Sequence, residues 1–131
     1  MLFETNKDKG RAGLVAAIGY FGMNGYTVSI PLNDTQDYDL IVDNGKELLK
    51  ISCKATSSRN PSGVSIVSLR NCGGSVGTVY GRENEKNIDY VFVLNEEQEM
   101  WLLPKEILTS NSMSLGEKYL QYKINTSVST V

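Results

Sequence analysis

One predicted hairpin brings an acid and a lysine together, and we expect the chemistry of the chain there. Asp39 stands at the start of one β-prone run and Lys54 near the end of the next, with Asn44-Gly45 between the runs. An Asn-Gly pair in this setting is a strong hairpin signal. A carboxylate can bind a hard divalent cation, which activates water and neutralises phosphate charge. A lysine can stabilise the developing charge or position that water. The pair therefore suits a metal-dependent phosphodiesterase.

The length of the turn decides which residues of the hairpin face each other. A two-residue loop pairs Asp39 with Lys50, whereas a four-residue loop pairs Asp39 with Ser52 and Asp37 with Lys54. Because alternate strand residues point to opposite faces, both registers place the acids on the face of Lys50, Ser52 and Lys54. The alternative without chemistry is a cross-strand ion pair on a solvated face, worth about 0.2–1 kcal/mol.

Composition narrows the chemistry further. The chain has 131 residues, two cysteines, no histidine and a formal net charge of −2. The lack of histidine excludes a Ser-His-Asp triad, a Cys-His pair and a histidine general base. A typical zinc site built from Cys and His is not expected either. The overall charge is not that of a basic nucleic-acid binder, although lysine and arginine can still cluster on one side.

The length is that of a single domain covering residues 1–131. No apolar run approaches the roughly 20 residues of a membrane span. The first residues lack the order of charge and apolar core that defines a signal peptide. We therefore expect a cytoplasmic location.

Periodicity predicts one helix followed by a β-rich chain. Apolar residues recur near helical spacing over residues 10–24, where many glycines and alanines suggest close packing on a sheet or another helix. A proline introduces a short helix at 105–108. Strands are predicted for the two halves of the hairpin and for residues 26–30, 64–69, 88–94, 100–103 and 118–124. This order predicts an α/β or α+β fold, with a mixed central sheet and the first helix against it.

Two polar loops have side chains that could meet phosphates. The loop at 57–63 reads equally well as a solvated linker. The glycine-rich stretch at 71–82 lacks the Gly-Lys-Ser/Thr of a phosphate-binding loop, so that motif is rejected. It is either a plain mobile loop or a β-ribbon near a polymeric ligand. The side chains available for such contacts are Arg59, Asn60, Arg70, Tyr80 and Arg82.

Taken in order, these residues resemble a known family. Lys9-Gly10, a helix, residues 25–28 (GYTV), Pro31, residues 38–42 (YDLIV) and residues 51–56 (ISCKAT) are similar to the PD-(D/E)XK nuclease superfamily. The chain looks most like the small group I intron-associated endonucleases, and more distantly like archaeal Holliday junction resolvases. The likeness continues from residues 68–70 to Tyr119 and Tyr122. It therefore covers nearly the whole chain.

This resemblance implies a restriction endonuclease-like fold, with a mixed central β-sheet flanked by helices, and Mg²⁺- or Mn²⁺-dependent cleavage of DNA. Asp39 would bind the metal, Lys54 would assist the attacking water or stabilise charge, and the Cys53 carbonyl could complete the metal shell. The Cys53 thiol is predicted to face the core. The substrate would be double-stranded or branched DNA, cut by a homo-oligomer (dimer or tetramer). The expected DNA contacts are Lys9, Arg11, Thr56, Arg59, Asn60, Arg70 and Arg82.

One position departs from the family pattern. Ser52 stands where relatives have a glutamate or glutamine, and a neutral hydroxyl is a weaker ligand for a hard cation. We keep Ser52 as a candidate catalytic and metal-binding residue. The glutamate that some relatives have on the first helix falls near Leu14, so a second acid would have to come from Asp37, Glu4 or Asp8. The alternatives to an active nuclease are a catalytically weakened DNA-binding relative and an interaction module that keeps only the fold.

Overall fold

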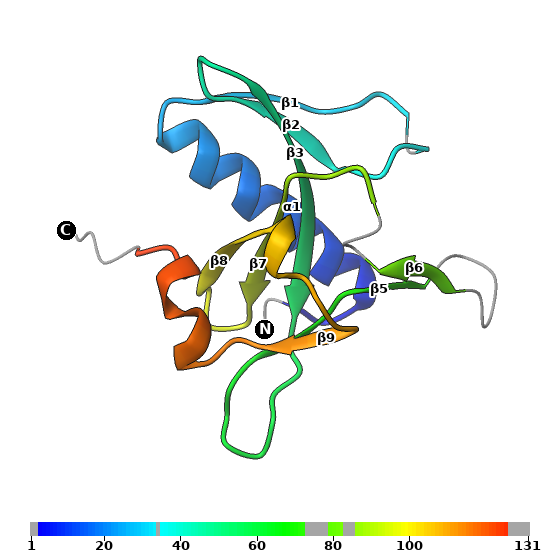
Figure 1. The fold of residues 1–131 in the computed structure, drawn as a ribbon, viewed down its shortest axis with the longest axis vertical. Helices are drawn as coiled ribbons and strands as arrows, with labels where there is room; N and C mark the ends of the chain where they lie inside the picture. The colour runs from blue at the N-terminus through cyan, green and yellow to red at the C-terminus, as the bar shows by residue number, and fades with distance from the viewer. Residues whose placement is uncertain (1–2, 34, 73–78, 83–85, 126–131) are drawn as a thin grey trace.

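A five-stranded mixed sheet forms the centre of the computed structural model, which describes residues 3–33, 35–72, 79–82 and 86–125 (Figure 1). Its strand order is β1-β2-β3-β7-β8. The central pair β3–β7 is parallel and every other neighbouring pair is antiparallel. The strands are β1 (Thr27–Ser29), β2 (Leu40–Asp43), β3 (Leu48–Thr56), β7 (Tyr90–Asn95) and β8 (Met100–Pro104). The predicted mixed sheet is confirmed.

One face of the sheet is covered by the helix α1 (Asn6–Met23). Its buried residues Ala17 and Phe21 pack with Leu40, Ile51 and Phe92. Among the glycines of α1, close packing is found at Gly13. A Cβ atom there would lie 3.1 Å from the backbone oxygen of Lys54, whereas one at Gly10, Gly19 or Gly22 would meet nothing within 4 Å. The prediction of close packing is therefore confirmed at one glycine, where the helix meets β3.

The helix begins four residues earlier than predicted. The hydroxyl of Thr5 accepts a hydrogen bond from the backbone N–H of Asp8 at 3.0 Å, and Thr5 itself is extended. This N-cap satisfies one of the free N–H groups at the helix start. The cap allows the polar residues 6–9 to form the first turn, although they add no apolar periodicity.

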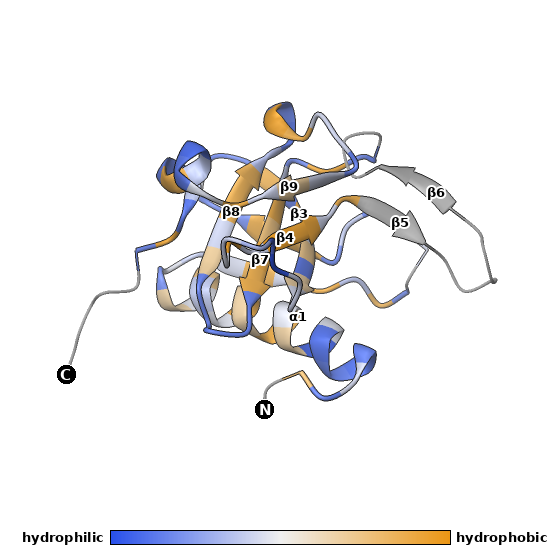
Figure 2. Ribbon diagram, turned by 90° about the horizontal axis from the view of Figure 1, so that it is seen from below, coloured by the Kyte–Doolittle hydropathy of each residue, from blue (hydrophilic) through white to orange (hydrophobic). Residues whose placement is uncertain are grey.

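The second face of the sheet is covered by a smaller sheet of β4 (Ile66–Ser68) and β9 (Ser112–Ser114), with short 3-10 helices at Lys105–Ile107 (η2) and Glu117–Tyr122 (η3). Figure 2 shows the hydrophobic strands of the main sheet between α1 and this layer. Val91 and Val93 of β7 point to this layer, and Phe92 and Leu94 point to α1. Strand β7 is thus buried on both faces of the sheet. In the part of the chain described, the second layer contains β-strands and 3-10 helices in place of the α-helix that flanking helices would imply.

Two further segments, at 71–82 and 118–124, test predictions made from the sequence. The stretch at 71–82 contains an antiparallel ribbon of β5 (Arg70–Cys72) and β6 (Val79–Arg82), so the β-ribbon interpretation is confirmed for these residues. Figure 1 shows the ribbon projecting from the two layers. The strand predicted at 118–124 is wrong, because most of it is the helix η3 and only Lys123 forms an isolated bridge, to Trp101. No helix among the described residues has the length and hydrophobicity needed to cross a membrane.

Candidate functional site

The hairpin adopts the four-residue register. Leu40 lies opposite Ile51 and Asp43 opposite Leu48, so residues 44–47 form the loop. The side chain of Asn44 accepts hydrogen bonds from the backbone N–H groups of the third and fourth loop residues, both at 2.9 Å. Gly45 has φ +90°, a conformation that favours glycine. Lys50 lies opposite Ile41, which rules out the two-residue register and its pairing of Lys50 with Asp39.

Asp39 sits immediately before β2 and contacts both neighbours of Ser52. Its backbone N–H donates to the carbonyl of Ile51 at 2.8 Å. Its carboxylate Oδ2 accepts a hydrogen bond from the backbone N–H of Cys53 at 2.7 Å. The Asp39 carboxylate is therefore held on the backbone of β3, at the edge where β2 has not yet begun.

Ser52 is a buried hydroxyl, with 3% of its surface exposed. Among the residues that the structure describes, its side chain makes no hydrogen bond. A buried polar group without a partner is unusual and costs free energy, so such a group needs an explanation. Its position between the two contacts of Asp39 means that a molecule or ion held by Asp39 would be a close partner for this hydroxyl.

The side chain of Cys53 lies in the core, whereas its backbone N–H faces the Asp39 site. Its side chain packs in the cluster beneath α1, as predicted. Burial, followed by the nearby negative charge of Asp39, raises the pKa of the Cys53 thiol far above its ordinary value, which disfavours a thiolate nucleophile. A strand residue directs its N–H and C=O to the same side. Since the Cys53 N–H reaches Asp39, we expect the Cys53 carbonyl to face the same edge.

Lys54 follows Ser52 on the same face of β3 and is partly buried. Its backbone carbonyl lies where the helix comes closest, against Gly13. The helix α1 therefore packs on β3 at Lys54. Asp39, Ser52 and Lys54 are brought to one edge, as the four-residue register predicts.

Two of the other acids considered for the site have partners outside β3. Oδ2 of Asp37 accepts a hydrogen bond from the backbone N–H of Asn87 at 2.8 Å. Asp8 is paired with Arg11 at 2.6 Å, and this hydrogen bond, with a smaller contribution from Thr5, lowers the pKa of the Asp8 carboxyl. Glu4 is exposed just before α1. Among the acids considered, Asp39 contacts the backbone of β3, at the Cys53 N–H.

The donors at this edge suit a hard divalent cation. They are oxygen atoms of Asp39, Cys53 and Ser52, the type that Mg²⁺ and Mn²⁺ prefer. In the described ranges no group of three or more His, Cys, Asp or Glu residues could hold a metal. Mg²⁺ keeps several waters and is commonly held by one or two carboxylates together with substrate phosphates. A single carboxylate therefore fits such an ion, whereas an all-protein cage is not present among the described residues.

The expected DNA contacts near β3 are largely engaged within the fold. The hydroxyl of Thr56 is 6% exposed and donates to the carbonyl of Ile66 at 2.5 Å. This geometry argues against a DNA contact by Thr56. Asn60 Oδ1 accepts from the N–H groups of Ser62 and Val64. Arg59 donates to the Gly63 carbonyl and forms an ion pair with Glu97.

The remaining expected contacts lie on the start of α1 and on the β5–β6 ribbon. Lys9 and Arg11 are in the first turns of α1, and Arg11 is occupied by Asp8 while largely exposed. The Cα atoms of Arg70 and Arg82 are partners across the β5–β6 ribbon. The side chains of these two arginines and of Tyr80 lie outside the described part of the structure, so their DNA contacts stay predictions.

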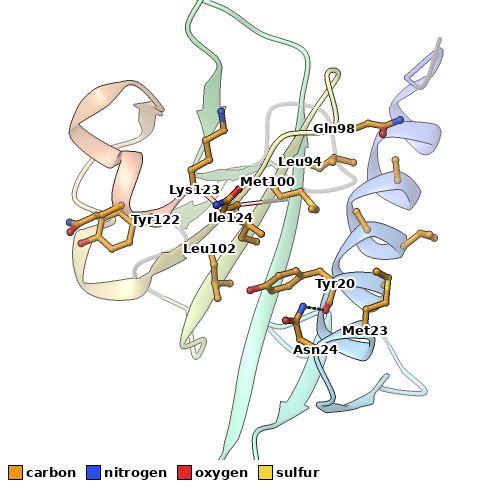
Figure 3. A pocket seen from close by; sticks show the side chains of 16 residues that line it. Tyr20, Met23, Asn24, Leu94, Gln98, Met100, Leu102, Tyr122, Lys123 and Ile124 are labelled. Carbon is orange, nitrogen blue, oxygen red and sulfur yellow. Dashed lines mark hydrogen bonds between the residues drawn. The ribbon is translucent and has the colours of Figure 1, made fainter. Parts of the chain in front are cut away.

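A groove of about 1120 Å³ runs between α1 and the β7–β8 strands (Figure 3). Tyr20 and Met23 of the helix line one side, and Met100 and Leu102 line the other. The groove lies on the helix side of the sheet, whereas Ser52 and Lys54 point to the opposite face. This groove is therefore separate from the Asp39 edge.

Sequence reasoning missed two polar residues that organise this region. Asp89 Oδ2 accepts a hydrogen bond from the backbone N–H of Lys50 at 2.8 Å, and Asn87 Oδ1 accepts one from the Lys50 ammonium at 3.0 Å. Their partners lie 39 and 37 residues away along the chain. Local patterns do not reveal contacts of this range, and the Asn-Ile-Asp stretch reads only as the start of a strand.

Comparison with known proteins agrees with this architecture. The structure is similar to that of a bacterial homing endonuclease, I-Ssp6803I, with a TM-score of 0.78 and 22% sequence identity over 91% of this chain and 88% of that chain. It also matches the structure of MepB, with a TM-score of 0.47 and 14% identity over 88% and 97% of the two chains. No curated protein matches the sequence. Residues 4–130 match the PD-(D/E)XK endonuclease family. The fold is therefore restriction endonuclease-like, and the chain belongs to the PD-(D/E)XK endonucleases.

Proposed function

We propose that the chain is a metal-dependent endonuclease that hydrolyses phosphodiester bonds of duplex DNA at the Asp39 edge of β3. The observation that carries the proposal is the position of Asp39, whose backbone and carboxylate contact the two neighbours of Ser52. The buried Ser52 hydroxyl, without a hydrogen bond among the described residues, supports a ligand at this place. Membership of the endonuclease family supports the reaction class.

Each residue has a distinct task in this proposal. Asp39 and the Cys53 carbonyl would hold Mg²⁺ or Mn²⁺, which when bound neutralises phosphate charge and makes a water more acidic. The hydrogen bond from the Cys53 N–H orients the Asp39 carboxylate before substrate arrives. Lys54, on the same face, positions the attacking water or stabilises charge on the phosphate. Ser52 offers a neutral hydroxyl to a water or a phosphate oxygen at the same point.

The substrate and assembly follow from the same proposal. Duplex DNA presents two strands, so cutting both is simplest for a homo-oligomer that places one Asp39 edge on each strand. Branched DNA is the other substrate to be compared. With a net charge of −2, binding would depend on local cations such as Lys9 and on the arginines of the β5–β6 ribbon.

Nicking of supercoiled plasmid DNA tests the proposal, with Mg²⁺, Mn²⁺ or EDTA present. We expect the wild type to cleave DNA with either ion and not to cleave it with EDTA. The variants Asp39→Asn and Lys54→Ala should not cleave DNA with either ion. Asp39→Asn is the sharper variant, because an asparagine oxygen can still accept the hydrogen bond from Cys53 while the charge that binds the metal is lost. Full cleavage by Asp39→Asn would show that this residue has only a structural task.

A second candidate function, favoured by the hydroxyl at Ser52, is a catalytically weakened DNA-binding protein. A site with one carboxylate and a serine hydroxyl offers weaker oxygen ligands to a hard cation than one in which a Glu or Gln stands at this position. This candidate expects DNA binding that falls steeply with salt, because phosphate contacts release counterions. Such binding, without cleavage in Mg²⁺ or Mn²⁺, would select it over the nuclease.

A further inference from the structure

Asp37 connects two segments that are far apart in the sequence. Its Oδ2 accepts the backbone N–H of Asn87 at 2.8 Å, across 50 positions of the chain. Asp37 lies two residues before Asp39, in the segment that leads to β2. Asn87 lies in the segment that returns from the β5–β6 ribbon to β7. One carboxylate thus joins the base of the ribbon to the chain that presents Asp39.

The returning segment is fastened to the sheet at several further points. The Lys50 ammonium donates to Asn87 Oδ1 at 3.0 Å. Lys50 and Asp89 exchange two hydrogen bonds at 2.8 Å, from the Lys50 N–H to Asp89 Oδ2 and from the Asp89 N–H to the Lys50 carbonyl. The Lys105 ammonium donates to the Lys86 carbonyl at 2.5 Å, and Ile88 is 4% exposed. This segment is a fixed support for the residues bonded to it.

The other end of the ribbon is also anchored. Leu69, just before β5, is fully buried, and its N–H donates to the carbonyl of Asn111 at 2.8 Å. The described chain is therefore fastened just before β5, at Leu69, and again between β6 and β7, from Lys86 to Asp89. Of the contacts at the base of the ribbon, the bond from Asn87 to Asp37 leads directly to the backbone of Asp39.

We propose that Asp37 is a positioning residue for cleavage, which fixes Asp39 relative to the base of the β5–β6 ribbon. This inference rests on the proposed function, and it assigns Asp37 a task other than metal binding. A two-stranded ribbon fits the major groove of DNA, so its fixed base sets where the scissile phosphate lies relative to Asp39. A small misplacement of a reacting group can lower a rate about 100-fold.

Two substitutions separate positioning from metal binding. Asp37→Asn keeps an oxygen that accepts the Asn87 N–H, whereas Asp37→Ala removes it. The matched control is Asp43→Ala, because Asp43 Oδ1 accepts the N–H of Gly45 at 2.8 Å at the opposite end of β2. The measurements are the rate of plasmid cleavage in Mg²⁺ and the affinity for Mn²⁺ by titration calorimetry. Wild type and Asp39→Asn are measured alongside.

We expect Asp37→Ala to cleave about 10- to 100-fold more slowly than the wild type, with unchanged Mn²⁺ affinity. Asp37→Asn and Asp43→Ala should cleave at rates near that of the wild type. If Asp37→Ala does not fold, Lys50→Met, which removes the ammonium contact to Asn87, should show the same slower cleavage with unchanged Mn²⁺ affinity.

Two results would overturn the inference while leaving the proposed function in place. One is wild-type cleavage by Asp37→Ala, or by Lys50→Met in its place. The other is an Asp37→Asn variant as slow as Asp37→Ala with weakened Mn²⁺ binding, which would make Asp37 a metal ligand. A wild type that cleaves no DNA in either metal would overturn the proposed function and this inference together.

Discussion

The backbone N–H of Cys53 donates a hydrogen bond to the carboxylate of Asp39 at 2.7 Å. In a regular antiparallel ladder a backbone carbonyl would accept a bond of this kind. Here the side chain accepts it, because β2 begins only at Leu40. The carboxylate is therefore oriented by the backbone of β3.

Substitutions of Ser52 should change the stability of the protein and its activity in different ways. Ser52→Ala removes a buried hydroxyl that has no bond among the described residues. We expect the free energy of unfolding to stay the same or to rise by up to about 1 kcal/mol, measured by urea denaturation. A loss of more than about 1 kcal/mol would mean that the hydroxyl is satisfied in the folded protein.

Ser52→Gln and Ser52→Glu restore the residue types of the family at this position. The amide or carboxylate oxygen added next to Asp39 should strengthen Mn²⁺ binding and increase cleavage. The effect should be larger for the charged glutamate. Titration calorimetry and plasmid nicking measure the two effects, with Ser52→Ala as the control. Unchanged Mn²⁺ affinity in both variants would place Ser52 outside the metal shell.

Gly13→Ala should destabilise the protein although alanine is the better helix former. The new Cβ would lie 3.1 Å from the backbone oxygen of Lys54, and we expect a loss of about 1–3 kcal/mol from overpacking. Gly19→Ala is the matched control in the same helix, since its Cβ would meet nothing within 4 Å. That variant should gain up to about 1 kcal/mol. A higher melting temperature for Gly13→Ala than for Gly19→Ala would contradict the close contact of α1 with β3.

The ion pair between Glu99 and Lys123 predicts a pH dependence of stability. The Lys123 ammonium donates to Glu99 Oε2 at 2.5 Å, and this bond, then one from Asn95, lowers the pKa of Glu99 from 4.5. A lowered pKa gives stability that is complete above pH 4.5 and is lost as the pH falls through the folded value. Glu99→Gln should therefore cost about 0.5–1 kcal/mol at pH 7, with a smaller loss at pH 3. Denaturation curves giving an equal loss at both values would contradict this account.

Local chemistry was sufficient to predict the hairpin and the position of Asp39. Asn44-Gly45 predicts a turn because glycine tolerates positive φ and the asparagine side chain binds the turn backbone, and both features are found. The alternation along β3 correctly separated Cys53, which faces the core, from Ser52 and Lys54. The choice between two turn lengths needed the structure, since both gave the same faces.

Other features depended on signals that periodicity does not capture. The residues 118–124 alternate like a strand, but η3 consists of two short 3-10 turns that meet at a kink at Tyr119. The rings of Tyr119 and Tyr122 lie 6.5 Å apart and pack against the core. The early start of α1 depends on one capping side chain, Thr5. The bond between Asp37 and Asn87 spans the chain, so no local pattern could predict it.

The most direct test of the metal site is the anomalous diffraction of a crystal soaked with Mn²⁺. The account predicts one peak at bonding distance, about 2.0–2.6 Å, from a carboxylate oxygen of Asp39, with the Cys53 carbonyl on the same ion and the Ser52 hydroxyl beside it. The Asp39→Asn crystal should lack the peak. An Mn²⁺ ion bound elsewhere, with none at Asp39, would contradict the central claim.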